Sequence, residues 1–339
     1  MTSFNSISDL SRSFQLRIGQ STLKNRLDQL TQEMTTGVKS DIAGSLGGDL
    51  SRISHIETRL TMLTTYQRNA SEAESILDGM QSVLEAAQVT VDDLGPRLLS
   101  EANTLAENTL RMRAGDVEQQ FRAMVNSMNT SIGGRYLFSG SRVDSAPLRD
   151  FESLLAGLNA AVGTATTAAD IAARIDAWFD APTGSGGFAD AVFQGDESGN
   201  VTHSVSPDIR IDTGLNAATA ELRDTFKGMA ILTFAAQAGP AVDSDTLRAL
   251  FTDAGTRLAR GSTGLTAVRA EIGQKDAALA QAQVRNFAEA SALTIARSTL
   301  TSADPFETAT ALQEVEARIQ GLYTLTARLS RLSLTDYLK

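Results

Sequence analysis

Apolar residues recur at alternating spacings of three and four near both ends of this chain, and this pattern constrains its fold most. The N-terminal stripe comprises Leu23, Leu27, Leu30 and Met34. The C-terminal stripe comprises Leu312, Val315, Ile319, Leu322, Leu325, Leu329 and Leu332, and it is continued by Leu334 and Leu338. This spacing places the side chains on one face of a helix, as in a coiled coil. We therefore expect a long helix at each end and take these residues as a candidate assembly interface.

The same spacing continues over two stretches further from the chain ends. The first is formed by Leu77, Met80, Leu84, Ala87, Val91, Leu94 and Leu98. The second is formed by Leu265, Val268, Ile272, Leu279, Ala282, Leu293, Ala296 and Leu300. Four of the six prolines fall between residues 147 and 240, so the flanking arms are nearly free of a residue that is costly inside helices. We expect the two arms to pair antiparallel.

Local signals predict where some of these helices begin. Asp116 stands in a capping-box pattern, so we expect a helix to start there, after a kink at Gly95-Pro96. Asp304 directly precedes Pro305, and proline is favoured at the first position of a helix. This pair predicts the start of the last helix.

The centre of the chain has a different composition. Glycine-rich segments such as residues 184–187 are typical of loops. Apolar residues alternate at 201–205 and 209–211, which predicts short strands, and we expect short helices around 171–179 and 222–234. The predicted fold class is mainly α: an antiparallel long-helix rod formed by the paired N- and C-terminal arms, with a small mixed α/β insert domain in the centre.

These features predict three parts of the chain. Residues 1–40 plus 305–339 form terminal coiled-coil helices, residues 41–145 plus 256–304 form a helical rod domain with a β-hairpin, and residues 146–255 form an outward-facing insert. Residues 141–255 hold 7 basic and 16 acidic side chains, whereas the two terminal segments together hold 9 basic and 7 acidic ones. The acidic surface is therefore central. We expect that an insert of this kind, which projects from the rod, can be deleted and the rod rejoined.

Composition argues against several classes of function. The chain has no cysteine, which excludes disulfides, thiol catalysis and thiolate metal sites. Its two histidines, His55 and His203, are too few for a multi-histidine metal site, and no catalytic pattern surrounds them. The formal net charge of −10 disfavours nucleic acid and anionic membranes as partners. We expect no enzyme activity, no cofactor, no signal peptide and no membrane span.

One segment is more specific than the helical spacing. Residues 134–140 read Gly-Arg-Tyr-Leu-Phe-Ser-Gly, follow a predicted helix, and place Tyr136 and Phe138 on one face of a strand. By residue pattern alone this is a β-hairpin packed on the long helices. Together with Asp144 and Ala146-Pro147, which follow it, the segment resembles a motif of the flagellin superfamily.

The resemblance extends along both arms. Further similar positions are Leu27, Leu30, Thr36-Gly37, Phe193-Gln194-Gly195-Asp196, Arg269, Glu271, Ile272 and Gly273. The ending, Leu332 to Leu338, is similar to the terminus of family members at the hook–filament junction. The segment from Thr35 to Gly44 departs from the sequence that filament flagellins carry there. The resemblance therefore favours a junction protein.

The resemblance implies a structural function in the bacterial flagellum. In the family, paired terminal helices form the inner tube of the axis, the central domain faces outward, and no catalytic residues exist. Members leave the cell through the type III flagellar export apparatus and become extracellular. The implied partners are a hook-side axial protein, flagellin, copies of the chain itself in a ring, and an export chaperone before secretion.

Two other functions remain open from the sequence. A filament flagellin would belong to the same class. A cytosolic coiled-coil interaction protein would explain the apolar spacing equally well, although it would leave residues 134–140 unexplained.

Overall fold

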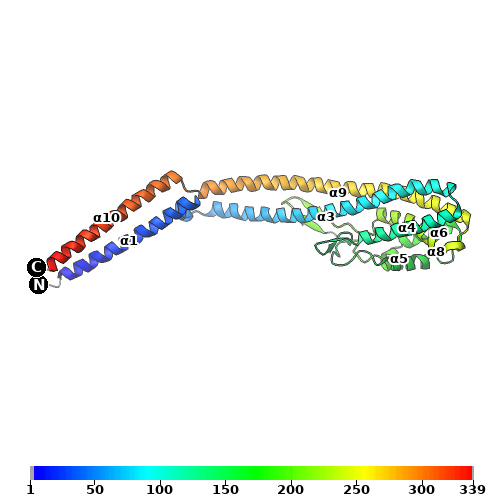
Figure 1. Ribbon diagram of the computed structural model, residues 1–339, viewed down its shortest axis with the longest axis horizontal. Helices are drawn as coiled ribbons and strands as arrows, with labels where there is room; N and C mark the ends of the chain where they lie inside the picture. The colour runs from blue at the N-terminus through cyan, green and yellow to red at the C-terminus, as the bar shows by residue number, and fades with distance from the viewer. Residues whose placement is uncertain (1–3, 200, 338–339) are drawn as a thin grey trace. The chain divides into compact units, whose positions relative to one another are not determined.

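The computed structural model describes residues 4–199 and 201–337, with side chains described for residues 11, 14–199 and 201–328 (Figure 1). The chain divides into two units, Met1–Met62 with Ala288–Lys339, and Leu63–Phe287. Helices dominate both units. The predicted fold class, mainly α with long helices and a small mixed insert, is confirmed. The three-part division of the chain stays a prediction.

The long helices belong to both arms of the chain. They are α1 (Phe4–Thr36), α3 (Ser51–Thr104), α4 (Glu107–Met128), α9 (Ser244–Thr301) and α10 (Pro305–Tyr337). The shorter helices are α2 (Ile42–Ser45), α5 (Phe151–Val162), α6 (Ala168–Phe179), α7 (Phe188–Ala191), α8 (Ala220–Ala238) and the 3-10 turn η1 (Gly239–Ala241). Two antiparallel hairpins complete the described chain, β1 (Ser131–Ile132) with β2 (Arg135–Tyr136), and β3 (Thr202–Ser204) with β4 (Arg210–Asp212).

The predicted seam of the second unit is present between α3 and α9. Every seam residue expected between 77 and 98 is buried, and so are Leu265, Val268, Ile272, Leu279 and Ala282 on α9. Polar side chains fix the register of the two helices: the Gln81 amide donates to the carbonyl of Arg269 at 2.8 Å, and Gln283 donates to Glu74 at 2.9 Å. The spacing of apolar residues therefore predicted this contact correctly.

One predicted helix boundary is wrong. Asp116 lies inside α4, which begins at Glu107, and its carboxylate pairs with Arg113 at 3.1 Å. α3 continues through Pro96 to Thr104. The helix backbones approach closely beside that proline, because a Cβ on Gly255 of α9 would stand 2.9 Å from the carbonyl oxygen of Gly95. Buried neighbours on both sides outweigh the single hydrogen bond that the proline removes.

The start of the last helix is as predicted. Asp304 accepts hydrogen bonds from the backbone N–H groups of Phe306 and Glu307, at 2.8 and 3.2 Å. The side chain thus satisfies two of the donors that a helix leaves free at its N-terminus. α10 begins with Pro305.

The second hairpin is held to both long helices. The strands predicted at 201–205 and 209–211 pair as β3 and β4. On α3, the Asn69 amide donates to the carbonyl of Ser204 at 2.9 Å, and on α9, the buried Asn286 donates to the carbonyl of Val205 at 2.7 Å. Asn286 is a polar residue within the apolar seam of α9, and this contact satisfies its side-chain amide.

The segment Gly-Arg-Tyr-Leu-Phe-Ser-Gly also forms a hairpin. Arg135 and Tyr136 make up β2, and Phe138 is fully buried. Ser139 then pairs with Asn216 in an isolated bridge. The loop is closed by Asp196, which accepts from the hydroxyl of Ser141; this bond and those from Ser198 lower the pKa of the Asp196 carboxyl to about 2. Asp196 is thus a turn residue, as its glycine-rich surroundings predicted.

The central helices share one core with the long helices. Phe121 of α4 contacts Phe151 of α5 edge to face and Phe226 of α8, with ring centroids 5.6 and 5.7 Å apart. α8 packs against α4 and is buried on most of its surface. A Cβ on Gly228 of α8 would stand 2.9 Å from the side chain of Leu258 on α9, so only glycine allows this approach.

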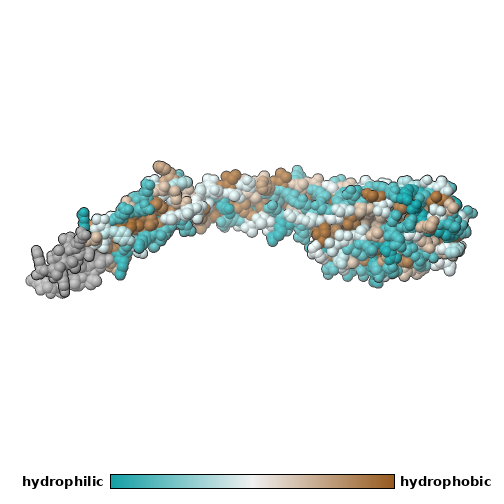
Figure 2. All heavy atoms as spheres, viewed as in Figure 1, coloured by the Kyte–Doolittle hydropathy of each residue, from teal (hydrophilic) through white to brown (hydrophobic). Residues whose placement is uncertain are grey.

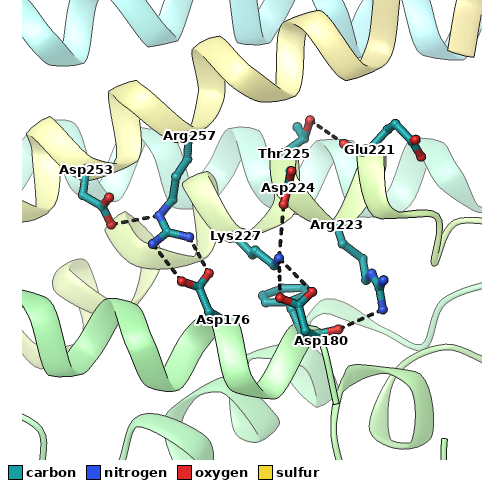
Figure 3. A network of polar contacts seen from close by, with 10 residues as sticks. Asp176, Asp180, Glu221, Arg223, Asp224, Thr225, Lys227, Asp253 and Arg257 are labelled. Atoms are coloured by element: carbon teal, nitrogen blue, oxygen red, sulfur yellow. Dashed lines mark hydrogen bonds and ion pairs between the residues drawn. The ribbon is translucent and has the colours of Figure 1, made fainter. Parts of the chain in front are cut away.

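Ion pairs add a second connection between the insert and α9 (Figure 3). Arg257 of α9 donates to both carboxylate oxygens of Asp176 on α6 and, at 2.8 Å, to Asp253. The ammonium of Lys227 on α8 is buried and lies between Asp180, at 2.9 Å, and Asp224. Fork-like contacts of this kind fix orientation as well as charge. The insert is thus tied to the long helix that follows it.

This shared core predicts that residues 146–255 are not removable. Their deletion would expose Phe121 and Leu258 and leave Arg257 without either carboxylate. Each uncovered large apolar side chain costs roughly 1.5–3 kcal/mol, against a total stability of about 5–15 kcal/mol. We expect the deleted chain to lose cooperative thermal unfolding in circular dichroism. A cooperative transition at the temperature of the full chain would contradict this expectation and support an insert that can be deleted without loss of the rod.

Candidate assembly interface

The two terminal helices form an antiparallel pair in the first unit (Figure 1). Near the chain ends, the Gln20 amide donates to the hydroxyl of Tyr323 at 3.1 Å. At the opposite end of the pair, Val38 forms an isolated bridge with Ser302. Rising residue numbers on α1 thus meet falling numbers on α10, which confirms that the terminal arms run antiparallel.

The joint between these helices is closed by backbone hydrogen bonds. The N–H of Lys39 donates to the carbonyl of Thr301 at 2.8 Å, and that of Ala303 donates to Gly37 at 2.9 Å. Gly37 adopts a φ of 69°, in the left-handed region that favours glycine. Past the joint, Asp41 caps α2 by accepting from the N–H of Gly44 at 2.8 Å. The segment that follows α1 and the segment that precedes α10 are therefore held to each other by backbone hydrogen bonds.

The predicted seam residues divide into a covered and an exposed set. Leu30 and Val315 are buried. The half-buried members are Leu23, Leu27, Leu312, Ile319 and Leu322. Met34 and Leu325 are exposed, Leu325 to 57%. The side chains of Leu329, Leu332 and Leu334 lie outside the described side chains, and Leu338 lies outside the described residues. The pair thus covers one part of its own stripe and leaves another part in water.

Further apolar side chains are exposed that the sequence reasoning missed. Phe14 and Ile18 of α1 are exposed four residues apart, a spacing that places them on one helix face. Tyr323 is exposed beside Leu322, and Phe306, at the start of α10, is exposed to 84%. The signal was a second apolar spacing on α1, beside the stripe from Leu23 to Met34. Figure 2 shows such apolar patches among polar surface.

The seam residues of α9 are also less completely buried within the first unit. Leu293 and Leu300 are half-buried, whereas Ala296 and the neighbouring Ile295 are exposed. Arg59 of α3 holds α9 here through two hydrogen bonds to Glu289, at 2.6 and 2.9 Å. This bidentate pair lowers the pKa of the Glu289 carboxyl. The first unit is therefore joined by polar contacts as well as by apolar ones.

The described residues offer little for chemistry. They contain no group of three or more His, Asp or Glu side chains that could hold a metal ion. His55 is exposed on α3, and His203 is buried on β3. Within the described part of the chain, no helix has an apolar stretch long enough to cross a membrane.

His203 is the one buried histidine among the described residues. Its Nε2 atom is buried and has no hydrogen-bond partner there. Burial lowers the pKa of His203 below its usual value; the Glu72 carboxylate on α3 opposes this shift, and the Arg135 guanidinium on β2 adds to it. Glu72 and Arg135 pair with each other at 3.1 Å. Protonation would therefore place a second cation beside Arg135 in a poorly hydrated position.

The lowered pKa of His203 predicts acid sensitivity. The folded chain favours the neutral imidazole, so stability is complete above the unfolded pKa near 6.5 and falls as pH drops through the folded value. We expect His203→Gln to reduce the loss of melting temperature between pH 7.5 and pH 5. The exposed His55→Gln is the matched control and should change nothing. Equal acid sensitivity in wild type and His203→Gln would contradict this prediction.

The division of the seam predicts opposite effects for two aspartate substitutions on α10. Val315→Asp places a carboxylate against α1, so we expect it to destabilise the helix pair by about 2–4 kcal/mol. Leu325→Asp places the same charge on an exposed position and should change the free energy of unfolding by less than about 0.5 kcal/mol. Urea unfolding of the two purified variants measures both. Equal destabilisation would mean that Leu325 belongs to the fold of the monomer.

Comparison with known proteins finds one matching family model and a shared fold. Residues 7–143 match the family model of the bacterial flagellin N-terminal helical region. No curated protein matches the sequence.

Several solved structures share the fold at low identity. A candidate flagellar hook-associated protein from Vibrio parahaemolyticus has a TM-score of 0.51 and 13% identity over 74% of this chain and 99% of its own. Flagellar hook-associated protein 3 from Legionella pneumophila has a TM-score of 0.52 and 12% identity over 73% of this chain and 98% of its own. Bacillus cereus FlgL has a TM-score of 0.49 and 16% identity, over 72% of this chain and 100% of its own. The first two likenesses show a common fold.

Proposed function

We propose that this chain, whose residues 7–143 match the flagellin N-terminal family model, is a flagellin-superfamily protein and a structural adaptor at the hook–filament junction, of the hook-associated protein 3 type. Its partners would be hook-associated protein 1 on one side, flagellin on the other, and copies of itself in a ring. Before secretion through the flagellar export apparatus it would be held by an export chaperone. Its place is then extracellular, in the flagellum, and it needs no catalytic residue.

One observation carries this proposal: the terminal pair exposes apolar side chains on helices that already pack together. Phe14, Ile18 and Leu325 remain in water after α1 and α10 have covered Leu30 and Val315. A contiguous apolar surface on a soluble protein marks an interaction site. Neighbouring subunits in an axial tube would bury these side chains, at roughly 1.5–3 kcal/mol each.

The comparisons support the junction over the filament. Two solved proteins with this fold carry the name hook-associated, and the chain covers 98–99% of their length. The ending, Leu332 to Leu338, is similar to the terminus of junction proteins. Filament flagellin remains the second candidate, because the matching family model covers flagellins as well. A cytosolic coiled-coil protein is less well supported, since its seam would be closed within its own fold.

The proposal predicts a separation of folding from assembly. In flagellated cells, Leu325→Asp should be folded and exported, yet fail to receive flagellin at the hook, because a carboxylate would face neighbouring apolar helices. Flagellin would then accumulate in the medium and motility would be lost. Gln320→Asp, at an exposed polar position of the same helix, is the matched control and should retain motility.

Localisation tests the proposal independently of any variant. Antibody labelling of sheared flagella should place the wild-type protein between hook and filament. Labelling along the whole filament would instead identify a flagellin. Retention of the protein in the cytosol of flagellated cells would overturn the flagellar assignment.

A further inference from the structure

A shallow apolar groove lies between α3 and α4 in the second unit. Its volume is about 510 Å³. The lining residues used here are Ala86, Val89 and Asp93 of α3, and Ala123 and Met124 of α4. The alanines leave room above the helix backbones, and Val89 is exposed at the rim. The groove therefore offers space for a side chain larger than any that lines it.

An apolar ridge stands on α9 of the same unit. Val284 is exposed to 69% and Phe287 to 73%. Residues three apart share a helix face. Ala282 and Asn286 are buried toward α3 and the second hairpin, so the ridge projects away from the core. Phe287 is the most exposed large apolar side chain among the described residues of this unit.

The charges around the two features are complementary. Residues 85–93 of α3 hold three carboxylates, Glu85, Asp92 and Asp93, and no cation. Residues 281–288 of α9 hold one charged side chain, Arg285, which is exposed and has no carboxylate partner among the described residues. Asp93 lies in the groove and pairs only with Arg97 of its own helix, at 2.6 Å. A cation delivered with the ridge would therefore meet a carboxylate at the groove.

We propose that the α3–α4 groove of one copy receives the Val284–Phe287 ridge of a second copy of this chain. The Phe287 ring lies over Ala86 and Ala123, and Arg285 pairs with Asp93. This inference rests on the proposed function and names a subunit contact within the assembly. It adds a contact made by the second unit to the one expected from the terminal helices.

The positions of ridge and groove make the contact head-to-tail. Within one copy, Gln283 reaches Glu74, so the ridge lies level with the part of α3 near residue 70. The groove begins at Ala86. Its centre lies about 20 residues beyond residue 70 along α3, which is about 30 Å from the level of the ridge at 1.5 Å per residue. Each copy therefore offers its groove to one neighbour and its ridge to another. Copies with parallel long helices are offset along the axis by that distance, so the repeated contact generates a screw, and the ring of the proposed function is then a helical turn of subunits rather than a flat ring.

Cysteine cross-linking tests the contact directly, because the full chain contains no cysteine of its own. Val89→Cys and Phe287→Cys are introduced into separate full-length chains, which are mixed at concentrations that allow self-association and oxidised with copper phenanthroline. We expect a disulfide-linked dimer in the mixture and far less in either chain alone. Equal dimer in Phe287→Cys alone would show that ridge meets ridge and would overturn the proposal.

A charge substitution measures the strength of the contact. Phe287→Asp should weaken self-association in sedimentation equilibrium by about tenfold or more, as expected for a central aromatic contact. Met112→Asp is the matched control, since Met112 is exposed to 66% on α4 and does not line the groove. The proposal would be overturned if Phe287→Asp self-associates like the wild type. This holds also if that variant has lost flagellin binding.

These outcomes are separable from a failure of the proposed function. If antibody labelling places wild type and Phe287→Asp alike at the junction, the flagellar assignment holds and the ridge contact is wrong. If wild type is absent from flagella while the cross-link forms, the ridge contact holds in a protein with another role.

Discussion

The apolar seam between α3 and α9 is the contact on which the second unit depends. Leu84 and Leu94 on α3 meet a stripe on α9 that includes Leu265, and all three are buried. Gly255 lets the backbones of α3 and α9 approach closely, because a Cβ there would stand 2.9 Å from the carbonyl oxygen of Gly95. Because helices of this length gain most of their stability from such packing, α4, α8 and the second hairpin can order only against an established seam.

The central region is therefore a part of this core and not a separately folded insert. Its surface is acidic, but its inner face carries the aromatic residues that the long helices lack, among them Phe151 and Phe226. The same region places Asp176 and Asp180 against Arg257 and Lys227, cations that are themselves largely buried. Removing one partner of such a pair costs more than the pair contributes, since the other charge stays buried.

Local sequence patterns predicted the apolar stripes, the two hairpins and the start of α10 at Asp304, because each pattern depends on residues that are near one another in sequence. They failed at Asp116, where a carboxylate with a good capping sequence pairs with Arg113 inside a helix that starts earlier. They also missed Phe14, Ile18 and Phe287. Whether an apolar side chain on a helix is covered depends on which other helix approaches that face, and a single sequence contains no such distance information. The α3–α4 groove could not be predicted from the sequence for the same reason.

The terminal pair covers one apolar stripe within itself and leaves other apolar side chains exposed. Near the joint, Leu30 and Val315 are buried between α1 and α10, so the pair has a small core of its own there. Closer to the chain ends, Ile18 and Leu325 are exposed although the same two helices still lie together there. Two helices can cover only one stripe each, and residues outside that stripe need a third helix. No other described element of the first unit covers these side chains. The proposed assembly would supply a third helix from another molecule, and the chain end where the stripe is open is where it would pack.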